Sequence, residues 1–363
     1  MATKAGLKIN SLAVLRKVVF PKHSRYTHTN TRPAKGASVV QVAGVSRGAF
    51  GIPPSSSVSS VSTFIARVPA FLRNLFGGTS SVPMATGGDQ WWGEETVAVV
   101  TGGNKGIGYE IAKILAAEDV TCILTARSEE RGKIAAAKIL AETGKSVVFH
   151  KLDITDREDC VRLAEFVRSE YGHLDILVNN AGFAYHGNIF GAQEAMTTIE
   201  TNVAGTMNVC EAMKPVLNYD ALHKARIVNV CSMSGKTKLV AEPLRSQVTL
   251  AASHGTKEDV LALMQQFVDQ VEDGTWQSNG WPNTMYGVSK LGEATYTRVL
   301  ARELAAQEVL VSACCPGWCA TDMSSWSGRK TAAQGADTPV WLALAAPDSV
   351  SGAFWSERQR QAF

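Results

Sequence analysis

The stretch TGGNKGIG, which runs from Thr101 to Gly108, decides the fold of this chain. The apolar run Thr96–Val100 precedes it, and apolar residues at helical spacing follow it over residues 106–117. Its glycines allow a tight turn, and a helix that starts there directs its free amide groups and the positive end of its dipole at an anion. A strand, a glycine turn and a helix in this order are typical of a unit that binds the pyrophosphate of a dinucleotide. An ordinary glycine-rich loop is the alternative.

Beyond this turn, the chain alternates short β-rich runs with helical stretches. Strands are predicted at residues 120–125, 147–150, 174–178, 227–230 and 309–314, and helices at 129–142, 157–171, 194–217 and 284–304. The alternation predicts an α/β fold, in which a doubly wound parallel sheet of the Rossmann type carries helices on both faces. Such sheets bind ligands at the carboxyl ends of their strands, so candidate functional residues are expected there.

A long segment at about 235–282 interrupts the alternation before the last predicted helix. Six of its apolar residues fall at helical spacing and predict the buried face of an amphipathic helix: Val260, Leu263, Met264, Phe267, Val268 and Val271. We therefore expect a single Rossmann domain over residues 89–363, with an inserted helical segment.

The first 88 residues differ from the rest in charge. They contain eleven of the 36 Lys and Arg residues and none of the 33 Asp and Glu residues, since the first acid is Asp89. Basic charge together with many serines is typical of an organelle transit peptide, and we expect a chloroplast peptide in preference to a mitochondrial one. The alternative is a basic tail on a cytoplasmic protein. The apolar run Val61–Phe76 is shorter than the ~20 residues that cross a bilayer, so no membrane span is predicted.

Charge and cysteine content exclude several classes of partner. Residues 89–363 carry more acidic than basic residues, which leaves no general electrostatic basis for binding nucleic acid. The seven cysteines are an odd number without regular spacing, which argues against a disulfide framework. No Cys/His cluster has the spacing of zinc ligands, so we predict no metal site and a reducing compartment.

The end of the second strand indicates which dinucleotide binds. An NAD site places an acid there to accept a hydrogen bond from the ribose 2′-hydroxyl, but this strand ends Thr125-Ala126-Arg127-Ser128. Arg127 can instead neutralise a 2′-phosphate, with Lys105 across the glycine turn. This favours NADPH, and a solvated surface arginine is the alternative.

Two further strand ends supply candidate cofactor contacts. Asp153 follows the third strand and can accept from the adenine amino group, or it can cap the helix predicted from Arg157. Asn179-Asn180-Ala181-Gly182 follows the fourth strand, where small residues let the nicotinamide ribose lie against the backbone. A plain Asn/Gly turn is the alternative.

Tyr286 and Lys290 are the candidate catalytic pair. They lie four residues apart at the start of a predicted helix and therefore share one helical face. An ammonium near a phenol lowers the phenol's pKa, so that the tyrosine can pass a proton to a developing alkoxide near neutral pH.

Ser232 and Asn202 complete this candidate set. Ser232 follows the strand 227–230 and can hydrogen-bond a carbonyl oxygen, although Ser234 is a rival and either can be a turn serine. Asn202 is a poor helix former inside a predicted helix. We expect it to perturb the helix and to hold a water that relays protons from Lys290, unless it faces solvent.

Taken together, these residues resemble the classical short-chain dehydrogenase/reductase family. The resemblance covers roughly residues 95–356 and rests on the motifs at 101–108 and 179–182, on Asn202, Ser232, Tyr286 and Lys290, and on Pro316-Gly317 with Thr321. A closer resemblance, to the monomeric NADPH carbonyl reductases, lies in Lys105, in GWPNTMYGVSK at 280–290 and in ACCPGW and TDM between 313 and 323.

The resemblance implies a role for each matching residue. The implied catalytic set is Ser232, Tyr286, Lys290 and Asn202. The implied cofactor set is Thr101, Gly102, Asn104, Lys105, Gly106, Ile107, Gly108, Arg127, Asp153, Ile154, Asn179, Ala181, Gly182, Tyr286, Lys290, Pro316, Gly317, Cys319 and Thr321. Ser232 and Trp318 are the implied substrate contacts, with a core position as the alternative for Trp318.

The function implied is NADPH-dependent reduction of an aldehyde or ketone to an alcohol, with Tyr286 as the proton donor. The partner is then a small-molecule carbonyl substrate. A monomer is implied, because in this group a similar insertion covers the surface that other members use to oligomerise. The alternatives are NADP-dependent oxidation of a specialised secondary alcohol and a non-catalytic NADPH-binding sensor protein.

Overall fold

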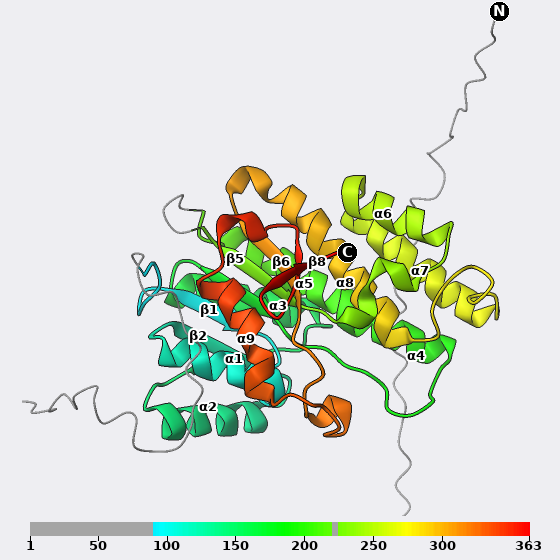
Figure 1. Ribbon diagram of the computed structural model, residues 1–363. Coiled ribbons are helices and arrows are strands. Elements are labelled where there is room, and N and C mark those ends of the chain that lie inside the picture. The colour runs from blue at the N-terminus through cyan, green and yellow to red at the C-terminus, as the bar shows by residue number, and fades with distance from the viewer. Residues whose placement is uncertain (1–89, 220–223) are drawn as a thin grey trace, which may run out of the picture. The chain divides into compact units, whose positions relative to one another are not determined.

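The computed structural model describes residues 90–219 and 224–363 (Figure 1). The predicted transit peptide at 1–88 and the apolar run within it lie outside the described residues. Among the described residues, no helix is both long and apolar enough to cross a membrane.

One eight-stranded sheet forms the centre of the described part, in the order β3-β2-β1-β4-β5-β6-β7-β8. All neighbouring strands are parallel except β7 and β8, which pair antiparallel. The strands are β1 Val97–Val100, β2 Thr121–Ala126, β3 Val148–Lys151, β4 Ile176–Asn179, β5 Arg226–Val230, β6 Leu310–Cys315, β7 Phe354–Ser356 and β8 Gln359–Gln361. The order reverses between β1 and β4, so the predicted doubly wound Rossmann sheet is confirmed, and its carboxyl edge is where a dinucleotide binds.

Helices cover both faces of the sheet (Figure 1). Val97 and Val99 of β1 pack into one core and Ala98 and Val100 into another, because successive side chains of a strand point to opposite faces. The second core is covered by α1 Gly106–Ala117, α2 Glu129–Thr143 and α9 Ala332–Leu344. The first is covered by α3 Arg157–Glu170, α5 Gly205–Met213 and α8 Met285–Glu303.

The insertion before α8 forms two helices, α6 Leu244–His254 and α7 Lys257–Glu272. All six residues of the predicted amphipathic face are buried in the first core. A capping box, in which Thr256 and Asp259 bond each other's backbone amides, fixes the start of α7. α7 packs on α8 and on α4 (Ala192–Ile199), and α6 packs on α7 and α8. The insertion therefore covers the outer side of the helices that carry the candidate catalytic residues.

The sequence-based prediction was wrong for one helix and incomplete at the C-terminus. The helix predicted at 194–217 is α4, then a π-helical turn at Glu200–Ala204, then α5 and a short 3₁₀ turn. The break falls at Asn202, whose side chain bonds to groups outside the helix. α6, α9, β7 and β8 were not predicted, and α9 contains Gly335 and Pro339, which hide its helical character.

Candidate active site

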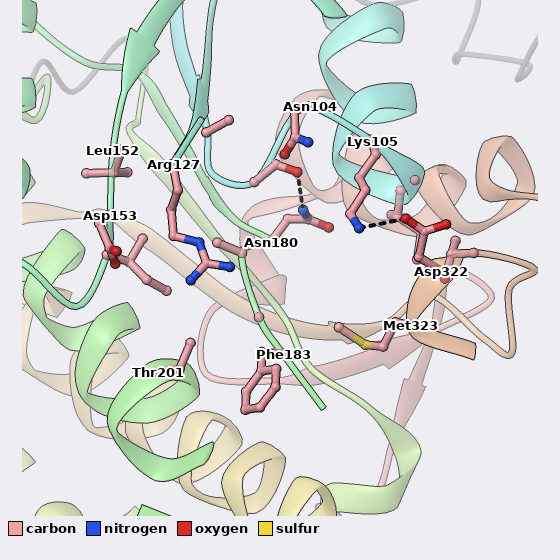
Figure 2. A pocket seen from close by; sticks show the side chains of 18 of the residues that line it. Asn104, Lys105, Arg127, Leu152, Asp153, Asn180, Phe183, Thr201, Asp322 and Met323 are labelled. Carbon is pink, nitrogen blue, oxygen red and sulfur yellow. Dashed lines mark hydrogen bonds and ion pairs between the residues drawn. The ribbon is translucent and has the colours of Figure 1, made fainter. Parts of the chain in front are cut away.

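A cavity of about 290 Å³ lies along the carboxyl ends of β1, β2, β3 and β4. The glycine turn forms one side, and the residues that follow the other strands complete the lining (Figure 2). The members of the predicted cofactor set that line it are Gly102, Asn104, Lys105, Gly106, Ile107, Arg127, Asp153, Ile154, Ala181, Gly182 and Thr321. The carboxyl edge thus assembles most of the predicted dinucleotide site.

At its glycines, the turn borders the cavity with backbone alone. Gly102 and Gly106 have positive φ angles of 65° and 58°. A Cβ on Gly102 would lie 2.9 Å from the Cα of Ala181, and one on Gly108 would lie 2.5 Å from the carbonyl oxygen of Gly102. These positions therefore require glycine, both for conformation and for the close approach of two chain segments.

Thr101 and Asn179 hold this wall together without lining it. The Thr101 hydroxyl accepts hydrogen bonds from the amides of Asn180 and Ala181 at 3.0 and 2.9 Å. The Asn179 side chain points away from the cavity and donates to Asn229 Oδ1 at 2.9 Å. Their contact with a cofactor stays a prediction, and the structure shows their side chains bonded to neighbouring protein groups. Asn180, which was not in the predicted set, lines the cavity and donates to the carbonyl of Thr101.

Two cations reach the cavity, but they are not equivalent. Arg127 is exposed and extends into the cavity near Asp153, and it has no charged partner in the described part of the chain (Figure 2). Lys105 turns instead to Asp322 on the opposite side, with its Nζ 2.6 Å from the carboxylate. Hydrogen bonding and charge from Lys105 lower the pKa of Asp322. Asp322, which sequence reasoning did not foresee, therefore competes with any anion for Lys105.

Asp153 lies in the cavity wall and does not cap the following helix. Its carboxylate accepts from the amide and hydroxyl of Thr155 at 3.0 and 2.8 Å. Asp156 is the N-cap of α3, accepting from the amide of Glu158. The capping alternative is thus wrong for Asp153, whose backbone and carboxylate remain at the cavity.

A second cavity, of about 260 Å³, has Tyr286 among its lining residues. It is walled by the loop Tyr185–Phe190, by Thr198 of α4 and by the approach to α8, with Asn283, Thr284 and Met285. None of the loop residues was singled out from the sequence, because no local pattern marks a pocket wall.

Tyr286 is half-buried, and burial raises the pKa of its phenol more than nearby Lys290 lowers it. The phenol is therefore protonated at neutral pH, contrary to the simple expectation of a lowered pKa.

Lys290 lies between the two cavities. Its Nζ donates to the Val230 carbonyl at the end of β5 at 3.0 Å, and lies 5.7 Å from the centre of the Tyr286 ring. A Cβ on Gly182, which lines the first cavity, would lie 3.4 Å from the same Nζ. Tyr286 thus lines the second cavity, and the Lys290 ammonium lies behind Gly182 of the first cavity, although neither residue lines the first cavity itself.

Ser232 is held near this pair by a tight turn. Its hydroxyl accepts from the Ser234 amide at 3.2 Å and from the Ser234 hydroxyl at 2.8 Å. The turn rests directly on α8, since a Cβ on Gly235 would lie 2.4 Å from the carbonyl carbon of Lys290. Ser234 is therefore the partner of Ser232 in the turn.

Asn202 is fully buried in the π-helical turn. Its side chain accepts from the Phe183 amide and donates to the Phe183 carbonyl, both at 2.9 Å, and it also donates to Ser289 Oγ at 2.9 Å. The predicted disturbance of the helix is confirmed, and a solvent-facing Asn202 is wrong. The contacts join the turn after β4 to the first turns of α8.

The segment after β6 lines the cofactor cavity at Thr321 but not at the other positions predicted from it. Cys319 is buried against α9 and α1, and its thiol contacts the Pro316 carbonyl. A Cβ on Gly317 would lie 2.9 Å from the Lys330 side chain. Trp318 is 59% exposed, which makes the alternative of a core tryptophan wrong, and it lines neither cavity.

Known proteins match this chain over the region that builds the site. The family model described as short chain dehydrogenase matches residues 96–245 and 276–331. The mouse protein "Carbonyl reductase [NADPH] 1" is 42% identical over 263 residues, covering 70% of this chain and 92% of that protein. The cattle protein of the same name is 40% identical over 275 residues, covering 72% and 96%.

Solved structures agree with the sequence matches. Salutaridine reductase from Papaver somniferum superposes with a TM-score of 0.66 at 31% identity, covering 72% of this chain and 99% of that one. Menthone neomenthol reductase from Mentha piperita has a TM-score of 0.62 at 29% identity, covering 73% and 99%. The chain therefore belongs to the short chain dehydrogenase family and is similar within it to the carbonyl reductases.

Proposed function

We propose that this chain is an NADPH-dependent carbonyl reductase in which Tyr286 donates the proton. The observation that carries the proposal is the placement of Tyr286 and Lys290 between two cavities, one bordered by Gly182 and one by the 185–190 loop. The names of the mouse and cattle relatives support the same activity and the same cofactor.

The residues at the first cavity fit NADPH. The close-packed glycines leave a backbone surface for the pyrophosphate, and α1 begins there with its N-terminal amides. Arg127 supplies a cation at the end of β2 that pairs with no carboxylate within residues 90–219 and 224–363, whereas an NAD-preferring site carries an acid there. Gly182 and the Ala181 backbone border the end of the cavity nearest Lys290.

Each catalytic side chain then has a distinct task. Bound NADPH supplies the hydride. Ser232 donates a hydrogen bond to the substrate carbonyl oxygen, and Tyr286 transfers the phenolic proton to that oxygen as its charge develops. Lys290 stabilises the phenolate that remains. Asn202 fixes the Phe183 backbone at the cavity, and we expect it also to hold a water that relays protons from Lys290.

Tyr286→Phe is the test of this assignment. The variant keeps the ring and its packing but cannot donate a proton, so the rate of carbonyl reduction is expected to fall at least about 100-fold while NADPH binding is retained. The measurement follows NADPH consumption with quinones, α-dicarbonyls and aldehydes, and NADPH affinity by fluorescence titration. Near-normal turnover in the variant would remove Tyr286 from the reaction.

The same assay separates the alternatives. NADPH binding without consumption across the whole carbonyl panel would favour a sensor protein. Turnover only with NADP⁺ and a secondary alcohol would favour a dehydrogenase.

Two further proposals concern the state and location of the protein. We infer a monomer, since α6 and α7 cover α4 and α8 where a partner subunit would otherwise pack. Light scattering of residues 89–363 tests this inference.

We also propose that residues 1–88 are a transit peptide, for a chloroplast in preference to a mitochondrion. A fluorescent fusion of residues 1–90 tests this, and diffuse cytoplasmic signal would contradict it.

A further inference from the structure

Glu293 is a buried acid beside the catalytic lysine. It follows Lys290 by one turn of α8, both side chains are 4% exposed, and its Oε2 lies 2.6 Å from Lys290 Nζ. The Thr206 hydroxyl, from α5, donates to its Oε1 at 3.3 Å. Burying a carboxylate is unfavourable unless it is paired, and removal of one partner leaves an uncompensated charge. The charge of Glu293 is therefore compensated by the Lys290 ammonium, and the charge of that ammonium is compensated by Glu293.

The ammonium of Lys290 is shared by three groups. It contacts the Glu293 carboxylate, donates to the Val230 carbonyl and lies over the face of the Tyr286 ring. Burial is the largest single influence and lowers the pKa of Lys290, but Glu293, together with Tyr286 and Cys231, outweighs it, so this pKa lies above its usual value. At neutral pH Lys290 is therefore charged in spite of its burial.

The same carboxylate acts on Tyr286 in the opposite sense to Lys290. Burial raises the pKa of Tyr286, Lys290 lowers it and Glu293 raises it again. The thiols of Cys315 and Cys231, at the ends of β6 and β5, would raise the pKa of Tyr286 in the same direction as Glu293 if they were ionised. Burial raises the pKa of Cys231, which keeps that thiol neutral. Glu293 is thus the negative charge that opposes Lys290 at the proton donor.

We propose that Glu293 is a positioning residue for proton transfer: it holds Lys290 as an ammonium and offsets that charge at Tyr286, so that the phenol stays protonated and the site favours reduction over alcohol oxidation. The inference rests on the proposed function and deepens it. Reduction adds a hydride from NADPH to the carbonyl carbon and the phenolic proton to the oxygen, which leaves a phenolate. Oxidation needs the phenolate at the start.

Because Tyr286 and Lys290 influence each other's protonation, the first step of proton loss belongs to the pair and not to either residue alone. A negative charge at Glu293 moves this step to higher pH. Its removal therefore moves to lower pH both the alkaline loss of reductase activity and the onset of alcohol oxidation. A side chain with a merely structural role would lower rate or stability and leave these pH positions unchanged.

Glu293→Gln is the test, because glutamine keeps the shape, removes the charge and retains one carbonyl oxygen that can accept from either Thr206 or Lys290. In the full chain without cofactor, ultraviolet difference absorbance follows tyrosinate formation, and subtraction of the matching Tyr286→Phe background isolates Tyr286. We expect Tyr286 to ionise about one to two pH units lower in the Gln variant. The pH profiles of reduction and oxidation are expected to shift in the same direction. Glu293→Asp is expected to restore part of the shift.

Glu303→Gln is the matched control, since it removes an acid from the last turn of the same helix and is expected to move neither profile. An unshifted Tyr286 titration in Glu293→Gln would overturn the proposal, whatever the effect on rate or melting temperature. If the Gln variant does not fold, Glu293→Leu is measured in the same way and the same criterion applies. The titration uses neither substrate nor turnover, so failure of the carbonyl-reductase assignment would be seen separately, in the Tyr286→Phe rates.

Discussion

The two walls of the site are built by different means. The cofactor wall is made of backbone, of glycines that permit close approach and of exposed charges such as Arg127 and Lys105. The catalytic wall is made of side chains buried in the core, among them Asn202, Lys290 and Glu293. Under the proposed function, the first wall would recognise a ligand by shape and by screened charge, and the second would control protons through charges in a low-dielectric interior. Substitutions in the two walls should therefore separate binding from turnover.

A pair of glycine substitutions should show this separation with the largest effects. A Cβ on Gly235 would lie 2.4 Å from the backbone of Lys290, so Gly235→Ala is expected to displace the Ser232 turn and lower kcat by about 100-fold, with NADPH affinity unchanged. Gly102→Ala combines a positive φ with a contact at 2.9 Å and is expected to weaken NADPH binding by about tenfold or more, with kcat retained at saturation. Steady-state kinetics and binding titrations measure both.

Two other glycines serve as controls for that pair. Gly144 has a φ of 71° but open space around a Cβ, and Gly93 has open space at an ordinary φ. Gly144→Ala should lower stability alone, and Gly93→Ala should change neither stability nor activity. If Gly235→Ala weakened NADPH binding as much as it lowered kcat, the distinction between the two walls would be lost.

Arg127→Ala sharpens the comparison within the cofactor wall. Loss of a charge-assisted hydrogen bond to a 2′-phosphate is expected to weaken NADPH binding by about 10- to 100-fold and to leave NADH binding unchanged. Isothermal titration with both cofactors measures this difference. Lys133→Ala is the control, because Lys133 is an exposed cation of α2 paired with Glu129. Equal losses for NADH and NADPH would contradict the assigned role of Arg127.

Asp322→Asn should give the smallest effect, and it has the opposite sign. The change releases Lys105 from an exposed ion pair, so NADPH binding is expected to tighten by about twofold to fivefold. Because the pair is exposed, the gain should fall as salt is added. The gain should vanish in a Lys105→Ala background, and its persistence there would show that Asp322 acts by another route.

Much of the fold follows from local sequence pattern. The bounds of α1 and the buried face of α7 were predicted residue by residue, because both segments carry strong helical periodicity. α9 was not predicted, because Gly335 and Pro339 weaken the helical pattern of its sequence. In the structure, Gly335 allows close contact with Cys319. The helix at 194–217 was predicted as one element with a disturbance at Asn202. The bond between the Asn202 side chain and Phe183 could not be predicted, because no local rule states which distant group that side chain will meet.

The site divides in the same way. Tyr286, Lys290, Ser232 and Arg127 follow strands or begin a helix, so their placement at the carboxyl edge could be predicted from topology. The walls of the second cavity come from the 185–190 loop and from residues before α8, which meet only in the folded chain. Trp318 and Asp322 lie close in sequence, in the segment after β6, but only Asp322 lines the first cavity, whereas Trp318 is exposed. Which of them would face the cavity was decided by the fold of that segment.

The sequence by itself determined that a glycine turn, a parallel sheet and a Tyr/Lys pair occur together, because spacing and periodicity are properties of the chain. Only the tertiary structure decided the electrostatics of that pair. Glu293 stands three residues after Lys290 in the printed sequence, but its charge matters because both side chains are buried and 2.6 Å apart. Charge in a protein interior acts through burial and distance, and both arise only when distant segments pack.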